Sequence, residues 1–235
     1  MPSRAYHESL WEDVPDGLAP AFVRQREAFL SREVAAARER LSGSSARHGG
    51  VAPLAAEKDG ADRSLRALDV GCGEGHFAAA LTRARVEVVA IDVAAEPLRR
   101  AREHHPDLDA RLVEPEASLP FEDSSFDIVW AGETIEHVAD TSRWLSELRR
   151  VLRSGGVLLL STPDHGLLSR LRLALSRGAF EAHFDPRSDH LRFYTRPALA
   201  TLLGDFGFED VAVRGVGGVP GARRVLLASG RRRRF

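Results

Sequence analysis

The chain has 235 residues, of which 43% are hydrophobic and 29% are charged, a composition typical of a folded globular protein. Its 33 basic and 34 acidic side chains give a formal net charge of -1, which argues against a general attraction to nucleic acid or anionic membranes. The single cysteine, Cys72, excludes an intrachain disulfide bond, and the first residues lack the pattern of a signal peptide. We therefore expect a cytoplasmic α/β protein without membrane insertion.

Residues 1–63 predict an N-terminal helical extension followed by a linker. Residues 21–41 have the apolar spacing of an amphipathic helix. The apolar face of this helix contains Phe22, Phe29, Leu30 and Val34. Residues 41–63 are rich in glycine, alanine and serine, as expected of a loose connection. Tyr6 and Trp11, ahead of the helix, are candidates for a lid over a binding site.

The rest of the chain, residues 64–235, alternates between apolar strands and amphipathic helices and predicts the main domain. Five strands are predicted at 66–70, 86–93, 110–114, 126–132 and 157–163. The helix predicted at 141–152 is expected to stop at Gly155 and Gly156. This βαβα order indicates a doubly wound, mostly parallel sheet with helices on both faces.

Residues 164–192 interrupt the alternation. Leucines at 167, 168, 171 and 175 predict a short amphipathic helix, and an aromatic, histidine-rich loop follows. Ligands bind at the carboxyl ends of strands in this architecture, so the insertion is a candidate substrate cap, with a plain connecting helix as the alternative. Two closing strands then predict an antiparallel edge and seven strands in all. Arg231–Arg234 are expected to form a solvated, disordered tail.

The most specific pattern directly follows the first predicted strand. Gly71, Gly73 and Gly75 lead into a helix, where glycines permit positive φ and let a ligand lie against the backbone. A dinucleotide fingerprint requires glycine at the sixth position, which is His76 here, and the lysine of a P-loop is absent. Asp92 ends the second strand, 21 positions after Gly71, and can accept hydrogen bonds from both hydroxyls of a ribose. Capping of the next helix is its alternative role.

The stretch Asp69-Val70-Gly71-Cys72-Gly73-Glu74-Gly75 resembles the first motif, D-x-G-x-G-x-G, of class I S-adenosylmethionine (SAM) methyltransferases. Residues 119–138, 148–165 and 190–211 are similar to later segments of the same superfamily. The resemblance implies a Rossmann-like methyltransferase fold with SAM as cofactor. The residues that it implies for cofactor binding are Asp69, Gly71, Cys72, Gly73, Gly75, Asp92, Val93, Glu114, Ala131 and Glu133.

The adenine contact is where this chain departs from the family. Members commonly carry an acidic residue after the third strand, often within Gly-Asp-Ala, that binds the adenine amino group. Here the corresponding stretch is Val113-Glu114-Pro115-Glu116-Ala117. We expect Glu114 to take this role, with Glu116 as the alternate.

Methyl transfer from a sulfonium is an in-line displacement, so a base is needed only when the acceptor atom carries a proton. Glu133, Glu136 and His137 have the i, i+3, i+4 spacing that places side chains on one face if the segment is helical. Together with His190 they form a candidate divalent-metal site, which resembles that of metal-assisted 2′-O-methyltransferases of small RNAs and ubiquinone-pathway O-methyltransferases. Without a metal, His137 or His190 is the candidate general base, because imidazole titrates near neutral pH.

Three functions fit this sequence. The balanced charge and the apolar insertion favour a small-molecule methyltransferase, most simply an O-methyltransferase of metabolite or natural-product biosynthesis. A metal-assisted RNA 2′-O-methyltransferase is the first alternative, and the even charge balance argues against RNA as a partner. A non-catalytic SAM-fold module that regulates or scaffolds a partner is the second, and the intact glycines and Asp92 argue against it. No pattern specifies the acceptor or the oligomeric state.

Overall fold

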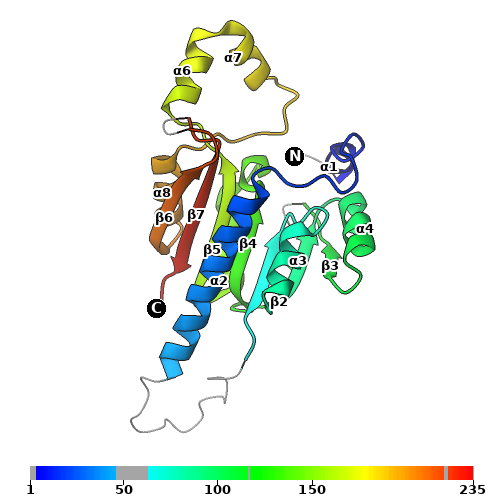
Figure 1. Ribbon diagram of the computed structural model, residues 1–235, viewed down its shortest axis with the longest axis vertical. Coiled ribbons are helices and arrows are strands. Elements are labelled where there is room, and N and C mark those ends of the chain that lie inside the picture. The colour runs from blue at the N-terminus through cyan, green and yellow to red at the C-terminus, as the bar shows by residue number, and fades with distance from the viewer. Residues whose placement is uncertain (1–3, 46–62, 116, 220–221, 235) are drawn as a thin grey trace.

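The computed structural model describes residues 4–45, 63–115, 117–219 and 222–234, so most of the predicted linker and Glu116 lie outside the described residues. Its centre is a seven-stranded sheet in the order β3-β2-β1-β4-β5-β7-β6 (Figure 1). The strands are β1 (Arg66–Val70), β2 (Glu87–Asp92), β3 (Asp109–Leu112), β4 (Phe126–Gly132), β5 (Leu152–Pro163), β6 (Phe208–Val216) and β7 (Val225–Arg232). β1 to β5 pair in parallel, and β7 is antiparallel to β5 and β6. The predicted fold class is confirmed.

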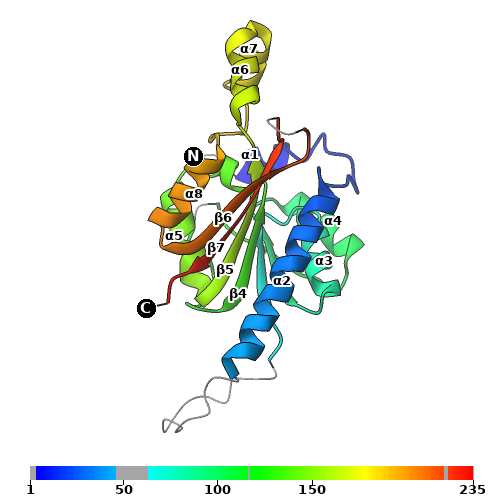
Figure 2. The same ribbon diagram turned by 60° about the vertical axis from the view of Figure 1, so that its left-hand side comes forward.

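Helices cover both faces of the sheet, as Figures 1 and 2 show. The helices are α1 (Arg4–Ser9), α2 (Val23–Ser45), α3 (His76–Arg83), α4 (Ala95–His104), the 3-10 turn η1 (Ile135–His137), α5 (Thr141–Val151), α6 (Leu167–Leu175), α7 (Arg177–His183) and α8 (Arg196–Asp205). Successive strand residues alternate between the faces, so Ala67 packs with α2, α3 and α4 whereas Leu68 packs with α5 and α8. None of the described helices is long and apolar enough to cross a membrane.

Helix α2 is a structural layer of the domain. Its residues Phe29, Leu30, Val34 and Ala37 are all buried in the same core as the sheet residue Trp130. Phe29 meets the Trp130 ring edge-on, with centroids 6.4 Å apart. The apolar face predicted for this helix therefore packs on the sheet, and the core extends across the predicted boundary at residue 63.

The glycine pair after α5 has a different role from the one predicted. Helix α5 ends at Val151 and β5 begins at Leu152, so Gly155 and Gly156 lie inside the strand. The register between β4 and β5 shifts there, which is the signature of a β-bulge. Gly155 has a φ of 76°, and a Cβ on Gly156 would lie 2.9 Å from the Arg153 carbonyl oxygen. The glycines are needed for the bulge, and the prediction that they stop the helix was wrong.

The C-terminal arginines are ordered, contrary to expectation. Arg231 and Arg232 belong to β7, where Arg231 pairs with Asp210. The Arg232 guanidinium donates to the Leu152 carbonyl oxygen and, at 3.1 Å, to the Arg150 carbonyl oxygen. Antiparallel pairing and these carbonyl acceptors hold the end of the chain against the sheet.

Asp127 joins the start of the main domain to β4 and β5. Its carboxylate, which is 8% exposed, accepts hydrogen bonds from Arg63 at 2.6 and 2.7 Å, from the Arg66 amide at 3.0 Å and from Arg153 at 2.8 Å. Burial by itself would raise the pKa of Asp127, but the Arg63 and Arg66 hydrogen bonds and the Arg153 charge outweigh it and hold the pKa below its ordinary value. The folded state therefore stabilises the ionised form of Asp127.

Asp127→Asn is therefore expected to reduce the free energy of unfolding at pH 7 by about 2–4 kcal/mol in urea titrations. A carboxyl group whose pKa is lower in the folded than in the unfolded protein stabilises the folded state at pH values above its unfolded pKa of about 4. This contribution is lost as the pH falls through the pKa of the group in the folded protein. The difference between variant and parent should accordingly shrink in acid. Asp123→Asn is the control, because Asp123 also pairs with an arginine but its side chain is 74% exposed. An equal loss for both variants would contradict this role of Asp127.

Candidate cofactor and active site

A cavity of about 380 Å³ lies at the carboxyl edge of the parallel strands. Its lining includes these predicted residues: Gly71, Asp92, Val93, Glu114, Glu133 and His137. Asp69, Cys72, Gly73, Gly75 and Ala131 belong to the adjoining strand ends and turn but are not part of the lining. The position agrees with the rule that open α/β sheets bind ligands outside the carboxyl ends of their strands.

The glycine loop is held against the end of β2. The amides of Gly71 and Cys72 both donate to the Ile91 carbonyl oxygen, at 2.9 and 3.0 Å. Gly71, Gly73 and Gly75 have φ values of 70°, 53° and 80°, which side chains rarely allow. A Cβ on Gly71 would also lie 2.7 Å from the Thr134 hydroxyl oxygen. Glycine is therefore required by both the backbone and the space.

The Asp92 carboxylate braces this loop and faces the cavity. Its Oδ2 accepts from the Gly73 amide at 2.9 Å, and its Oδ1 accepts from the Ala94 amide at 3.0 Å. Burial raises the pKa of Asp92, while the Ala94 and Gly73 amides act in the opposite direction. A carboxylate can accept about four hydrogen bonds, so Asp92 has acceptor capacity beyond these two amides.

Asp69 lies in β1 and is only 1% exposed. Burial, followed by the charge of Asp92, raises the pKa of Asp69 to about 8, and a hydrogen bond from the Ala78 backbone acts against this. Among the described residues its Oδ2 has no hydrogen-bond partner. A carboxyl group in this environment is mostly protonated at neutral pH, so Asp69 adds little charge to the site.

The N-terminal segment closes one side of the cavity. His7, Leu10, Trp11 and Val14 all line it. The Trp11 ring lies against the glycine loop, because a Cβ built on Gly73 would be 3.1 Å from its Cη2. The Glu8 carboxylate accepts from the amides of Ala95 at 2.5 Å and Glu96 at 3.1 Å, which caps the N-terminus of α4. These contacts place the predicted lid residue Trp11 at the site.

Arg100 fastens this segment to the domain. It is 8% exposed, and its guanidinium donates to the carbonyl oxygens of Val14 at 2.8 Å and Trp11 at 3.3 Å. It also contacts Glu74 at 3.1 Å, and Glu74 in turn accepts from the Gly17 amide at 2.9 Å. The buried Arg100 guanidinium therefore contacts two turns of the N-terminal segment.

Arg100→Met is expected to loosen the segment while leaving the sheet intact. Each hydrogen bond to a charged group contributes about 1.5–3 kcal/mol, so amide exchange in residues 5–20 should accelerate about tenfold or more. Arg99→Met is the matched control, because in the part of the chain that the structure describes Arg99 pairs only with Glu96 and Glu103, on the exposed surface of α4. Unchanged exchange in the Arg100 variant would show that other contacts hold the segment.

Glu133 does not share a helical face with its neighbours, so that expectation was wrong. It directly follows β4 and has a φ of 52°, and the helical turn after it covers only Ile135–His137. Its Oε1 lies 2.7 Å from a guanidinium nitrogen of Arg26, which is 2% exposed, and accepts from the Ser161 hydroxyl at 3.0 Å. Glu133 is thus an ion-paired side chain in the wall of the cavity.

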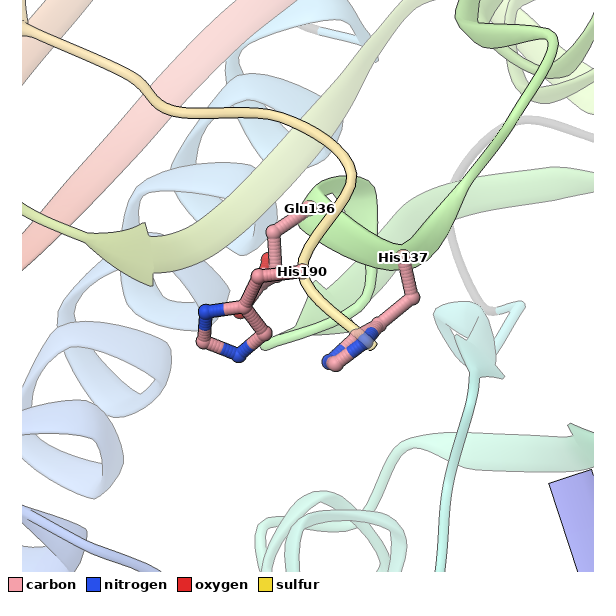
Figure 3. Close-up of side chains that lie close together, drawn as sticks. All are labelled: Glu136, His137 and His190. Atoms are coloured by element: carbon pink, nitrogen blue, oxygen red, sulfur yellow. The ribbon is translucent and has the colours of Figure 1, made fainter. Parts of the chain in front are cut away.

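The other three predicted metal ligands come together, as Figure 3 shows. One ligand atom each from Glu136, His137 and His190 lie within 4.8 Å of one another. Glu136 is 1% exposed, its Oε2 accepts from the Thr162 hydroxyl at 3.0 Å, and its Oε1 has no hydrogen-bond partner among the described residues. Burial, together with the charge of Glu133, raises the pKa of Glu136 to about 8. These side chains can hold a divalent cation, which would favour ionised Glu136.

The orientation of His137 is set by the insertion. Its Nδ1 lies 3.0 Å from the carbonyl oxygen of Asp189, and a carbonyl oxygen only accepts, so Nδ1 carries the hydrogen. Burial lowers the pKa of His137, which outweighs the raising effect of the Asp189 carboxylate. The imidazole is therefore neutral at pH 7 and keeps a lone pair on Nε2. This arrangement suits a general base.

Comparisons with known proteins identify the family. A family model described as a methyltransferase domain matches residues 22–213. The chain belongs to the SAM-dependent methyltransferases. It is 34% identical over 149 residues to a probable S-adenosylmethionine-dependent methyltransferase of Mycobacterium tuberculosis, covering 63% of this chain and 50% of that protein. It is 33% identical over 171 residues to a ubiquinone biosynthesis O-methyltransferase of a Bradyrhizobium species, covering 70% of this chain and 66% of the relative.

Solved structures support the fold. A carbon methyltransferase, CurJ, superposes with a TM-score of 0.64 at 16% identity, covering 98% of this chain and 58% of that one. A methyltransferase from Bacillus halodurans gives a TM-score of 0.57 at 20% identity, covering 74% and 94%. The chain spans about half the length of several curated relatives, including the M. tuberculosis methyltransferase at 50%.

SAM is the cofactor of this family, and the residues present fit it. Asp92 and Gly71 both line the cavity, so a carboxylate acceptor for the ribose hydroxyls and the backbone of the glycine loop are within reach of a bound cofactor. Glu114, whose side chain is 71% exposed, pairs with Arg4 at 2.7 Å and lines the cavity with Pro115. Glu114 therefore stays the candidate for the adenine contact.

Several lining residues were missed by the sequence analysis. Those without a prediction include Thr134, Arg143, Trp144, Glu147 and Asp189. The i, i+3 spacing of Trp144 and Glu147 places them on one face of α5, but which face meets the cavity depends on how the helix packs. Of the predicted cap, residues 164–192, Asp189 is the member that lines the cavity.

Proposed function

We propose that the methyltransferase transfers the methyl group of SAM to an oxygen of a small-molecule acceptor in metabolite or natural-product biosynthesis. The observation that carries this proposal is the position of His137, which lines the cavity and whose Nδ1 lies 3.0 Å from the Asp189 carbonyl oxygen, so that Nε2 is the ring nitrogen left to accept a proton. A hydroxyl acceptor carries a proton that must leave, and an imidazole at this position can take it.

SAM supplies a sulfonium-activated methyl group when bound. Asp92 and the glycine loop would hold the ribose and the methionine part. His137 Nε2 would accept the proton that the acceptor hydroxyl loses when its oxygen takes the methyl group. Trp11 and the rest of the N-terminal segment keep water away from this point. The alignment of the reacting atoms supplies several kcal/mol of the lowered barrier.

The cavity favours a small acceptor with an apolar body. Its wall has many apolar side chains, among them Leu10, Val14, Leu119, Val138 and Trp144. Its volume of about 380 Å³ is in the range usual for small-molecule sites. Two relatives named as O-methyltransferases, of ubiquinone biosynthesis and of malonyl-[acyl-carrier protein], support oxygen as the acceptor atom.

The test is transfer of labelled methyl from SAM to a panel of phenols, catechols, carboxylic acids, amines and RNA, with and without chelator. We expect labelled methyl ethers or esters and activity that chelator does not remove. Loss of activity with chelator, together with labelled RNA 3′ ends, would favour the metal-assisted alternative through Glu136, His137 and His190. SAM binding without transfer to any acceptor class would favour a non-catalytic module, and amine products alone would overturn oxygen as the acceptor.

A further inference from the structure

Helices α6 and α7 form an apolar hairpin, residues 167–184, that stands away from the rest of the domain in Figures 1 and 2. It carries six large exposed apolar side chains. Their exposed fractions are Leu167 61%, Leu168 46%, Leu171 44%, Leu175 85%, Phe180 51% and Phe184 43%. Soluble monomers rarely gather so many on one element unless it meets a partner.

The side chains of α6 are arranged around its axis as in an interfacial helix. With 3.6 residues per turn, the four exposed leucines fall within an arc of about 100°. Arg170 lies on one side of this arc and Arg172 on the other. Long arginine side chains beside an apolar face can keep their charges in the headgroup layer while the leucines enter the acyl boundary.

The charge of the hairpin supports the same arrangement. Residues 166–187 contain four arginines and two acidic residues, a net of +2, whereas the whole chain has a net charge of -1. Arg177 pairs with Glu181 at 2.7 Å, and Arg187 pairs with Asp185 at 2.6 Å. The excess positive charge therefore lies on Arg170 and Arg172, next to the leucines.

We propose that the apolar hairpin docks on the surface of an anionic lipid bilayer. The projecting shape suits a flat surface, and the flanking arginines complement anionic headgroups. None of the described helices can span a membrane, so the hairpin lies in the interface rather than across it. The hairpin follows β5 at the carboxyl edge of the sheet, so docking holds the edge that carries the cavity towards the bilayer. This proposal does not depend on the acceptor chemistry.

The test is flotation of the full chain with vesicles of phosphatidylcholine alone and of phosphatidylcholine with one third phosphatidylglycerol. Binding is expected on the anionic vesicles and should weaken at high salt. Arg170→Gln/Arg172→Gln should bind them about 30-fold more weakly, since each basic residue near the surface contributes a factor of about five. The double variant Leu171→Ser/Leu175→Ser should bind the anionic vesicles about tenfold more weakly, or weaker still.

Leu18→Ser is the matched control, because Leu18 is as exposed as Leu167, at 61%, but lies outside the hairpin. It should float like the parent protein, and all variants should keep the parent affinity for S-adenosylhomocysteine, which shows that they are folded. Absence of binding by the parent, or equal binding by parent and hairpin variants, would overturn the proposal. So would a dimer in sedimentation that the leucine variant dissociates, without vesicle binding, because the hairpin would then pair with a second copy.

Discussion

Asp92→Ala is expected to weaken binding of S-adenosylhomocysteine about 100-fold or more in calorimetric titration. The ribose hydroxyls lose two hydrogen bonds to a charged acceptor, each contributing about 1.5–3 kcal/mol. The Gly73 and Ala94 amides lose their acceptor as well, so the glycine loop is less well held for the methionine part.

Two further variants serve as comparisons for Asp92→Ala. Asp92→Asn keeps the size of the side chain and one carbonyl acceptor, and should fall between the parent and alanine. Glu114→Ala removes another carboxylate from the cavity lining, but this carboxylate is largely exposed. The variant should weaken S-adenosylhomocysteine binding by less than about tenfold. If Asp92→Ala bound as tightly as the parent protein while remaining folded, the ribose would not be held by Asp92.

His137→Gln is expected to lower kcat by a factor of about 10²–10⁴ while S-adenosylhomocysteine affinity is unchanged. Glutamine can still hydrogen-bond to Asp189 but cannot take a proton. Because burial lowers the pKa of His137, the base form predominates at neutral pH, and the parent activity should fall only as the pH drops below the ordinary histidine range. The variant should lose this limb of the pH–rate profile.

The comparison for His137 is His190→Gln. The two rings lie 4.9 Å apart, but His190 does not line the cavity. A much smaller effect at His190 agrees with His137 as the base. Equal losses at both positions, with activity restored by added divalent metal, would instead indicate that the two histidines act together as ligands.

The sequence was sufficient where short-range patterns decide the structure. The apolar runs of β1 and β4 match their predicted bounds, because strands buried on both faces read as continuous apolar segments. The alternating glycines and the position of Asp92 at the end of β2 indicated a candidate cofactor site, because a strand, a tight turn and a helix N-terminus are contiguous in sequence. The cavity lies where these signals meet.

The sequence could not show contacts between distant segments. Two of the partners of Arg100 are Trp11 and Val14, 89 and 86 positions away. Likewise, no local pattern connects Arg26 on α2 with Glu133, which follows β4. The left-handed backbone of Glu133 also breaks the helical spacing that its motif suggested, since the strand end and the Ser161 contact override it.

The most direct test of the cofactor site is a crystal structure of the protein with S-adenosylhomocysteine. We expect both ribose hydroxyls within about 3 Å of the Asp92 carboxylate oxygens and the homocysteine part against Gly71. We also expect Trp11 to cover the ligand from the side of the N-terminal segment. A ligand bound elsewhere, or one whose ribose does not contact Asp92, would show that Asp92 and the glycine loop do not form the cofactor site.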